Sequence, residues 1–126
     1  MTDVKKKILS RGDILEADDR KVVEVVCPEW GGVVLVRGLT GKERDEWENS
    51  LMDSKMNRKG IELKRENVRA RLVAISVVDE SGTLLFSETD IAALGQKSAA
   101  ALDRVFTVAS ELCGFGEEDL DELTKN

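Results

Sequence analysis

Residues Val22–Arg37 read VVEVVCPEWGGVVLVR. Two runs rich in β-branched valine, at 22–26 and 33–37, flank a connection that contains Pro28 and the pair Gly31-Gly32. Valine favours strands, whereas proline and glycine end them and form turns. The pattern predicts an antiparallel β-hairpin. Nearly every position of both runs is apolar, so we expect one face to pack on helices and the other to be available to a second subunit.

The chain after this hairpin is predicted to be mostly helical. Thr40 and Glu43 have the spacing of a capping box, which predicts a helix from there to about 54. Further helices are expected over about 62–77, 87–94 and 97–113, and after 117. The longest should bury the apolar stripe formed by Leu102, Val105, Phe106, Ala109 and Leu112. Gly114 suits the left-handed residue that ends such a helix, with Phe115 packing back onto it.

The predicted fold class is therefore α+β: an N-terminal antiparallel β-hairpin, with the segment 83–86 as a candidate extension, packed on four to five α-helices. A length of 126 residues fits one domain, which we place at 21–126. Residues 1–20 are polar and weakly patterned, and we expect a flexible arm there. Ile8, Leu9, Ile14 and Leu15 are the sizeable apolar residues that would hold this arm down.

The composition argues against an enzyme. The chain has no histidine, which removes the commonest general base near neutral pH and the commonest metal ligand. Cys27 and Cys113 are far apart and lie in apolar surroundings, so buried structural thiols are expected. The glycines near residue 40 lack the spacing of a phosphate-binding loop. We expect no catalytic residue, no metal and no cofactor.

Several features bear on location and partners. The start of the chain has no apolar signal segment, and no apolar run approaches the roughly 18 residues that span a bilayer. We therefore expect a soluble protein of a reducing cytoplasm. The formal net charge of −6 disfavours nonspecific binding to nucleic acid.

One stretch is basic: residues 55–71 hold seven lysines and arginines but two glutamates. Three interpretations stay open, namely a solvated face, a docking surface for RNA or an acidic partner, and an oligomer contact. In the third, the basic stretch of one copy meets the acidic tail of the next. The candidate residues for these charge contacts are Arg58, Lys59, Arg65, Glu117, Glu118 and Asp119.

Three stretches of the chain resemble the tail assembly chaperones of long-tailed bacteriophages. They are RGDILEADD at 11–19, PEWGG through VRGLTGKER within 28–44, and RARLVA followed by LGQKSAAALDRVF within 69–106. No piece is a sharp chemical signature, and their order along the chain carries the resemblance. The chain ends as the short form of such a chaperone would.

The resemblance implies a non-catalytic protein that binds the tape-measure protein and keeps it soluble while tail tube subunits assemble around it. It implies action in the host cell cytoplasm and absence from the mature virion. The tail tube protein, a longer frameshifted form of the chain and a homo-oligomer are further expected partners. Two alternatives remain open: a structural minor tail or connector protein retained in the virion, and a small regulator that binds protein or nucleic acid.

A chaperone of this kind needs exposed apolar surface, and the hairpin supplies it. We expect Trp30, Val34 and Val36 to contact the partner, with Leu39 behind them. Trp30 lies at the predicted turn, where it either folds inward as a plug or anchors a partner. Trp47 has an apolar neighbour one helical turn away in Leu51, and we expect it in the core.

Overall fold

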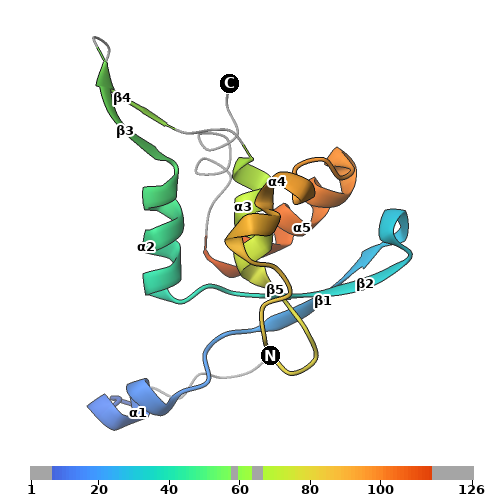
Figure 1. Cartoon of the computed structure of the whole chain (residues 1–126). Helices are drawn as coiled ribbons and strands as arrows, with labels where there is room; N and C mark the ends of the chain where they lie inside the picture. Colours follow the sequence, from blue (N-terminus) through green and yellow to red (C-terminus); the bar gives the residue numbers. More distant parts are fainter. Residues whose placement is uncertain (1–6, 58–59, 64–66, 115–126) are drawn as a thin grey trace.

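The computed structural model describes residues 7–57, 60–63 and 67–114, and it has the predicted α+β fold (Figure 1). Its strands are β1 (Val22–Cys27), β2 (Gly32–Arg37), β3 (Met52–Asn57), β4 (Gly60–Leu63) and β5 (Val77–Val78). Its α-helices are α1 (Arg11–Glu16), α2 (Gly41–Ser50), α3 (Val68–Ser76), α4 (Ile91–Leu94) and α5 (Ala99–Leu112). Two 3-10 turns, η1 (Pro28–Trp30) and η2 (Glu88–Asp90), connect them.

The predicted hairpin is confirmed. β1 and β2 pair antiparallel from Val22 opposite Arg37 to Cys27 opposite Gly32. Pro28 begins η1, and Gly31 ends it with a φ of 77°, a backbone conformation that glycine adopts without steric penalty. Pro28 thus ends the first strand and Gly31 forms the turn, as the sequence predicted.

A third strand, β5, extends this sheet in the order β1-β2-β5. The segment 83–86, our candidate extension, does not pair with the hairpin itself: Val77 and Val78 pair directly with β2, and Leu84 adds a single bridge to Val78. Both valines are β-branched and come directly after α3, so they continue the chain as a strand where we expected the last turn of a helix.

Helix α5 covers the inner face of the sheet, and α3 packs beside it (Figure 1). The predicted stripe is confirmed, since Leu102, Val105, Phe106 and Ala109 are buried and Leu112 is half-buried against the core. The helix ends as expected, with Gly114 in the left-handed conformation.

Helix α2 begins at the predicted capping box. The Thr40 hydroxyl accepts from the Glu43 amide at 3.1 Å, and the Glu43 carboxylate accepts from the Thr40 amide at 2.8 Å. Trp47 and Leu51 are buried in the core as expected. Arg44 joins α2 to the end of α5, because its guanidinium donates to the Cys113 carbonyl at 3.1 Å.

The predicted helix over 62–77 was wrong at its beginning. β3 and β4 form a second antiparallel hairpin, and α3 begins only at Val68. Asn57 pairs with Gly60 in this hairpin. Gly60 is therefore the first residue of a strand, just before the start of the predicted helix.

The N-terminal arm contains a helix that we did not predict, α1. Ser10 and Asp13 cap it reciprocally, since the Asp13 amide donates to the Ser10 hydroxyl and the Ser10 amide donates to the Asp13 carboxylate. No residue of α1 is buried, and its Ile14 and Leu15 are exposed. The helix predicted after 117 and the contact predicted for Phe115 lie outside the described residues.

Candidate partner-binding surfaces

The four predicted contact residues differ in their exposure. Val36 is 0% exposed and belongs to the core, so its side chain offers no surface to a partner. Trp30, Val34 and Leu39 are half-buried and pack against that core. Trp30 at the hairpin tip therefore combines the two alternatives, with part of its indole covered and part open to solvent.

The alternation of side chains along the hairpin explains these positions. Successive residues of a strand point to opposite faces of the sheet. Val25, Cys27 and Val36 lie on the face covered by α5 and are buried. Val26 and Val33 lie on the other face, directly opposite one another, and are 63% and 53% exposed.

This second face, which we call the outer face, consists of Val22, Val26, Val33, Leu35 and Leu85. The sequence predicted one open apolar face on the hairpin, but the contact residues that we chose, Val34 and Val36, do not belong to it. Because both faces of the hairpin are apolar, the register alone shows which valines are left exposed. The outer face borders an open hollow of about 700 Å³ in which Glu24, Asp79 and Glu80 supply carboxylates.

The turn beside the outer face is held by its own hydrogen bonds. The Asp79 carboxylate accepts from the amides of Ser81 and Thr83 at 2.8 and 3.0 Å. The Ser81 hydroxyl and these amides lower the pKa of Asp79 below its ordinary value, so the carboxylate stays charged. Arg37 of β2 also donates to the Gly82 carbonyl at 3.0 Å and ties the turn to the sheet.

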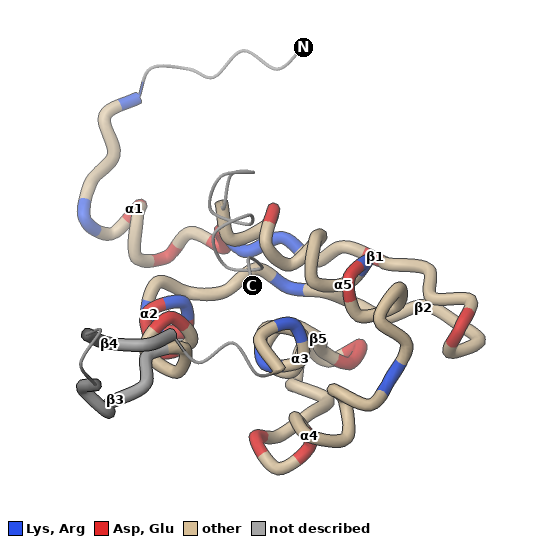
Figure 2. The backbone as a smooth tube through the Cα atoms, turned by 90° about the horizontal axis from the view of Figure 1, so that it is seen from above, with Lys and Arg blue, Asp and Glu red and all other residues tan. Residues whose placement is uncertain are grey.

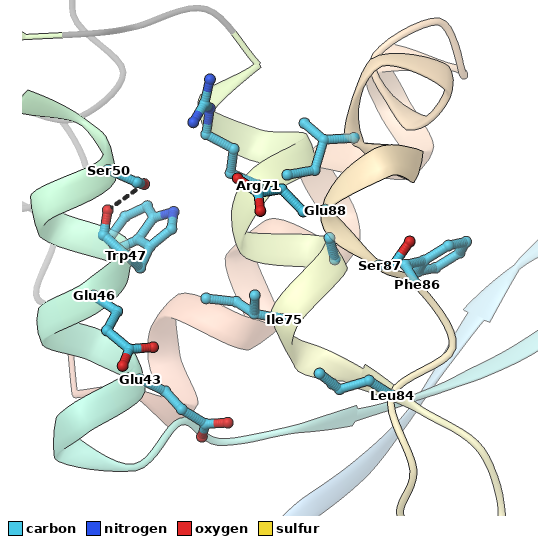
Figure 3. Close-up of a pocket in the computed structure, with 12 residues that line it drawn as sticks. Glu43, Glu46, Trp47, Ser50, Arg71, Ile75, Leu84, Phe86, Ser87 and Glu88 are labelled. Carbon is cyan, nitrogen blue, oxygen red and sulfur yellow. Dashed lines mark hydrogen bonds between the residues drawn. The ribbon is translucent and has the colours of Figure 1, made fainter. Parts of the chain in front are cut away.

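A second candidate surface is a groove between α2, α3 and the segment 84–91 (Figure 3). Its volume is about 340 Å³. The apolar lining residues, which we call the groove walls, are Trp47, Ala74, Ile75, Leu84, Phe86 and Ile91. Figure 3 shows Trp47 on one side, reaching from α2 toward α3, and Leu84 and Phe86 on the opposite segment.

Carboxylates dominate the charged lining of this groove: Glu43, Glu46 and Glu88 against the single guanidinium of Arg71. Glu43 also accepts from Arg20 at 3.3 Å, in addition to capping α2. Glu46 and Glu88 are exposed. No pattern in the sequence indicates this groove, because its walls come from three segments that only the fold brings together.

The two cysteines differ in their burial. Cys27 is buried as expected, and Cys113 is half-buried, where burial raises the pKa of its thiol.

Within the described ranges, no cluster of three or more His, Cys, Asp or Glu side chains is placed to hold a metal ion. No helix among those residues is long and apolar enough to cross a membrane. Figure 2 shows both signs of charge along α2, only basic residues on α3 and no charged residue on α4.

The residues proposed for oligomer charge contacts, Arg58, Lys59, Arg65, Glu117, Glu118 and Asp119, lie outside the described residues. Within the described part of the basic stretch, Arg69 pairs with Asp103 of α5 at 3.0 Å. Its guanidinium also lies 5.7 Å from the centre of the Phe106 ring. Arg69 thus joins α3 to α5.

The family model of phage tail assembly chaperones matches residues 15–126. The chain belongs to this family. This tail assembly chaperone also resembles the solved structure described as that of the bacteriophage HK97 tail assembly chaperone, with a TM-score of 0.52 and 18% sequence identity. The similarity covers 74% of this chain and 85% of the HK97 chain, and it shows a shared fold. No curated protein matches the chaperone.

Proposed function

We propose that this tail assembly chaperone binds the tape-measure protein of its phage and keeps it soluble while the tail tube assembles. It would act in the host cytoplasm without catalysis and be absent from the mature virion. The observation that supports the proposal is the outer face, where Val26 and Val33 are exposed directly opposite one another and Val22 is exposed further along the same face. Exposed apolar patches of this kind mark sites of protein interaction.

The hairpin tip supplies a second part of the proposed contact surface. Trp30 is half-buried there. Val34, on the core side of β2, and Leu39, just after this strand, are also only partly buried. Tryptophan is enriched among the residues that dominate binding energy. If Trp30 is such an anchor, Trp30→Ala should weaken tape-measure binding by about 2 kcal/mol.

The test is co-expression with the tape-measure protein of the same phage, followed by a solubility assay and a pull-down. The informative variant carries Val26→Lys together with Val33→Glu. These residues face each other across β1 and β2, so the new side chains form a cross-strand ion pair and the net charge is unchanged. The variant should fold but leave the tape-measure protein insoluble.

A matched control carries Ala92→Lys together with Ala93→Glu, at two exposed positions of α4 away from the sheet. The control should behave like the wild type. If the wild-type chain neither solubilises nor captures the tape-measure protein, the proposal fails. Mass spectrometry of purified particles tests the alternative of a virion component, because a chaperone should be missing from them.

A further inference from the structure

We infer that the groove between α2 and α3 binds an apolar side chain of the tape-measure protein whose neighbours are lysine or arginine. The inference rests on the proposed function and adds to it the chemistry of the bound segment. It concerns a surface separate from the outer face, because the two share no lining residue.

The groove walls are suited to an apolar anchor. Trp47 is buried in the core and closes one side, whereas Ile75, Phe86 and Ile91 are partly buried and still reach the groove. Leu84 is 44% exposed at its edge. Covering such apolar surface removes it from water, which favours binding. A volume of about 340 Å³ is in the range of concave sites that bind a ligand.

The charges at the rim select the neighbours of that anchor. Glu46 projects from α2 and Glu88 from η2, so a carboxylate stands on each side of the groove (Figure 3). Glu43 adds a third, partly balanced by Arg20, and Arg71 is the cation of the lining. The excess of carboxylates favours a basic segment and opposes an acidic one.

A helical segment satisfies both requirements at once. On a helix, residues three or four positions apart lie on the same face, about 5–6 Å from one another. A leucine or phenylalanine between two such basic residues places its side chain in the groove and a cation toward each rim carboxylate. Helices commonly bind to protein grooves in this way. The expected sequence is an apolar residue with Lys or Arg at three or four positions before and after it.

The experiment measures binding of overlapping fluorescent peptides that cover the tape-measure protein, by fluorescence polarisation with the full chain. Peptides with the basic–apolar–basic spacing should bind, and their versions with Glu in place of Lys or Arg should not. The double variant Glu46→Lys, Glu88→Lys should weaken binding of the basic peptides about tenfold at low salt and favour the acidic versions. Leu84→Ser, which makes the edge of the groove polar, should also weaken binding of the basic peptides.

The matched control is Glu16→Lys with Glu111→Lys, two exposed carboxylates outside the groove that change the net charge by the same amount. It should bind like the wild type. Unchanged affinity of the Glu46→Lys, Glu88→Lys variant, or equal affinity of the wild type for basic and acidic peptides, overturns the inference. If these results come with normal solubilisation of the tape-measure protein, the groove inference fails and the proposed function stands. If the wild type binds neither any peptide nor the whole tape-measure protein, the groove inference and the proposed function both fail.

Discussion

Arg104 of α5 and Glu29 at the tip of the β1–β2 hairpin form a bidentate ion pair, with nitrogen–oxygen distances of 2.7 and 3.0 Å. The two residues are 75 positions apart in the chain. The pair fixes the projecting end of the hairpin against the helix that fills its inner face. It also places the adjacent Trp30 on the core, where that indole is half-buried.

This ion pair predicts a dependence of stability on pH. Hydrogen bonds from Arg104 lower the pKa of Glu29 from 4.5 to about 2. A pKa that is lower in the folded chain stabilises the fold fully above the ordinary value, and this stabilisation is lost as the pH falls from 4.5 toward 2. Glu29→Gln should therefore reduce the loss of stability over that interval, measured by urea unfolding at a series of pH values.

Arg104→Met provides the check on the cause. It should flatten the pH dependence to the same extent as Glu29→Gln, and the double variant should be no flatter than either single variant. Equal pH dependence in the wild type and in Glu29→Gln would contradict the assignment.

Two valines on the same strand should respond differently to the same truncation. Val36→Ala removes methyl groups from a fully buried site and should lower the free energy of unfolding by about 2 kcal/mol. Val33→Ala, on the outer face, should change it by less than about 0.5 kcal/mol. Urea titrations of both variants compare the two sites directly, and similar losses would show that the register is not the one described.

Ser110 offers a substitution that should not destabilise the chain. Its hydroxyl is fully buried in α5 and has no hydrogen-bond partner among the described residues, so folding removes it from water without replacement. Ser110→Ala should be neutral or raise the free energy of unfolding by about 1 kcal/mol. Ser98→Ala is the contrast, because the Ser98 hydroxyl accepts from the Ala101 amide and caps α5. Ser98→Ala should lower the free energy of unfolding by about 1 kcal/mol. Thermal unfolding of the two variants and the wild type measures both effects.

The cap of α2 gives a prediction that the sequence alone already supports. Thr40→Ala removes the hydroxyl that accepts from the Glu43 amide and should destabilise the chain by about 1 kcal/mol. Lys42→Ala, at an exposed position of the same first turn, should have little effect. A Thr40→Ala variant as stable as the wild type in urea would show that the capping box contributes nothing.

The elements that were predictable from the sequence have strong local signals. The hairpin has valine runs around a proline and two glycines, and α2 and α5 have caps and apolar stripes. The β3–β4 hairpin has no such signal, because the described strand Met52–Asn57 reads MDSKMN, without a β-branched residue. Helix α1 has a local signal in the cap formed by Ser10 and Asp13, but its apolar residues meet no core, so the pattern of a buried helix face is missing.

The candidate binding surfaces were less predictable for a physical reason. In a hairpin that is apolar on both faces, a shift of one residue in the register exchanges buried and exposed side chains. The sequence therefore favoured Val36, which is buried, over its neighbour on the opposite face, Leu35. The groove depends on Trp47, Ile75 and Leu84, which are far apart in sequence and come together only when α2 and α3 pack.

The alternation along β1 and β2 has a consequence for how this chaperone can evolve. Residues 23, 25 and 27 are constrained by the packing of α5, whereas 22, 24 and 26 are their immediate neighbours and meet no helix. Mutations can therefore accumulate on the outer face by single steps without reducing the stability of the fold. Under the proposed function, a phage whose tape-measure protein changes can change its chaperone in step, one outward-facing residue at a time, while the inward-facing half of the same strands stays the same.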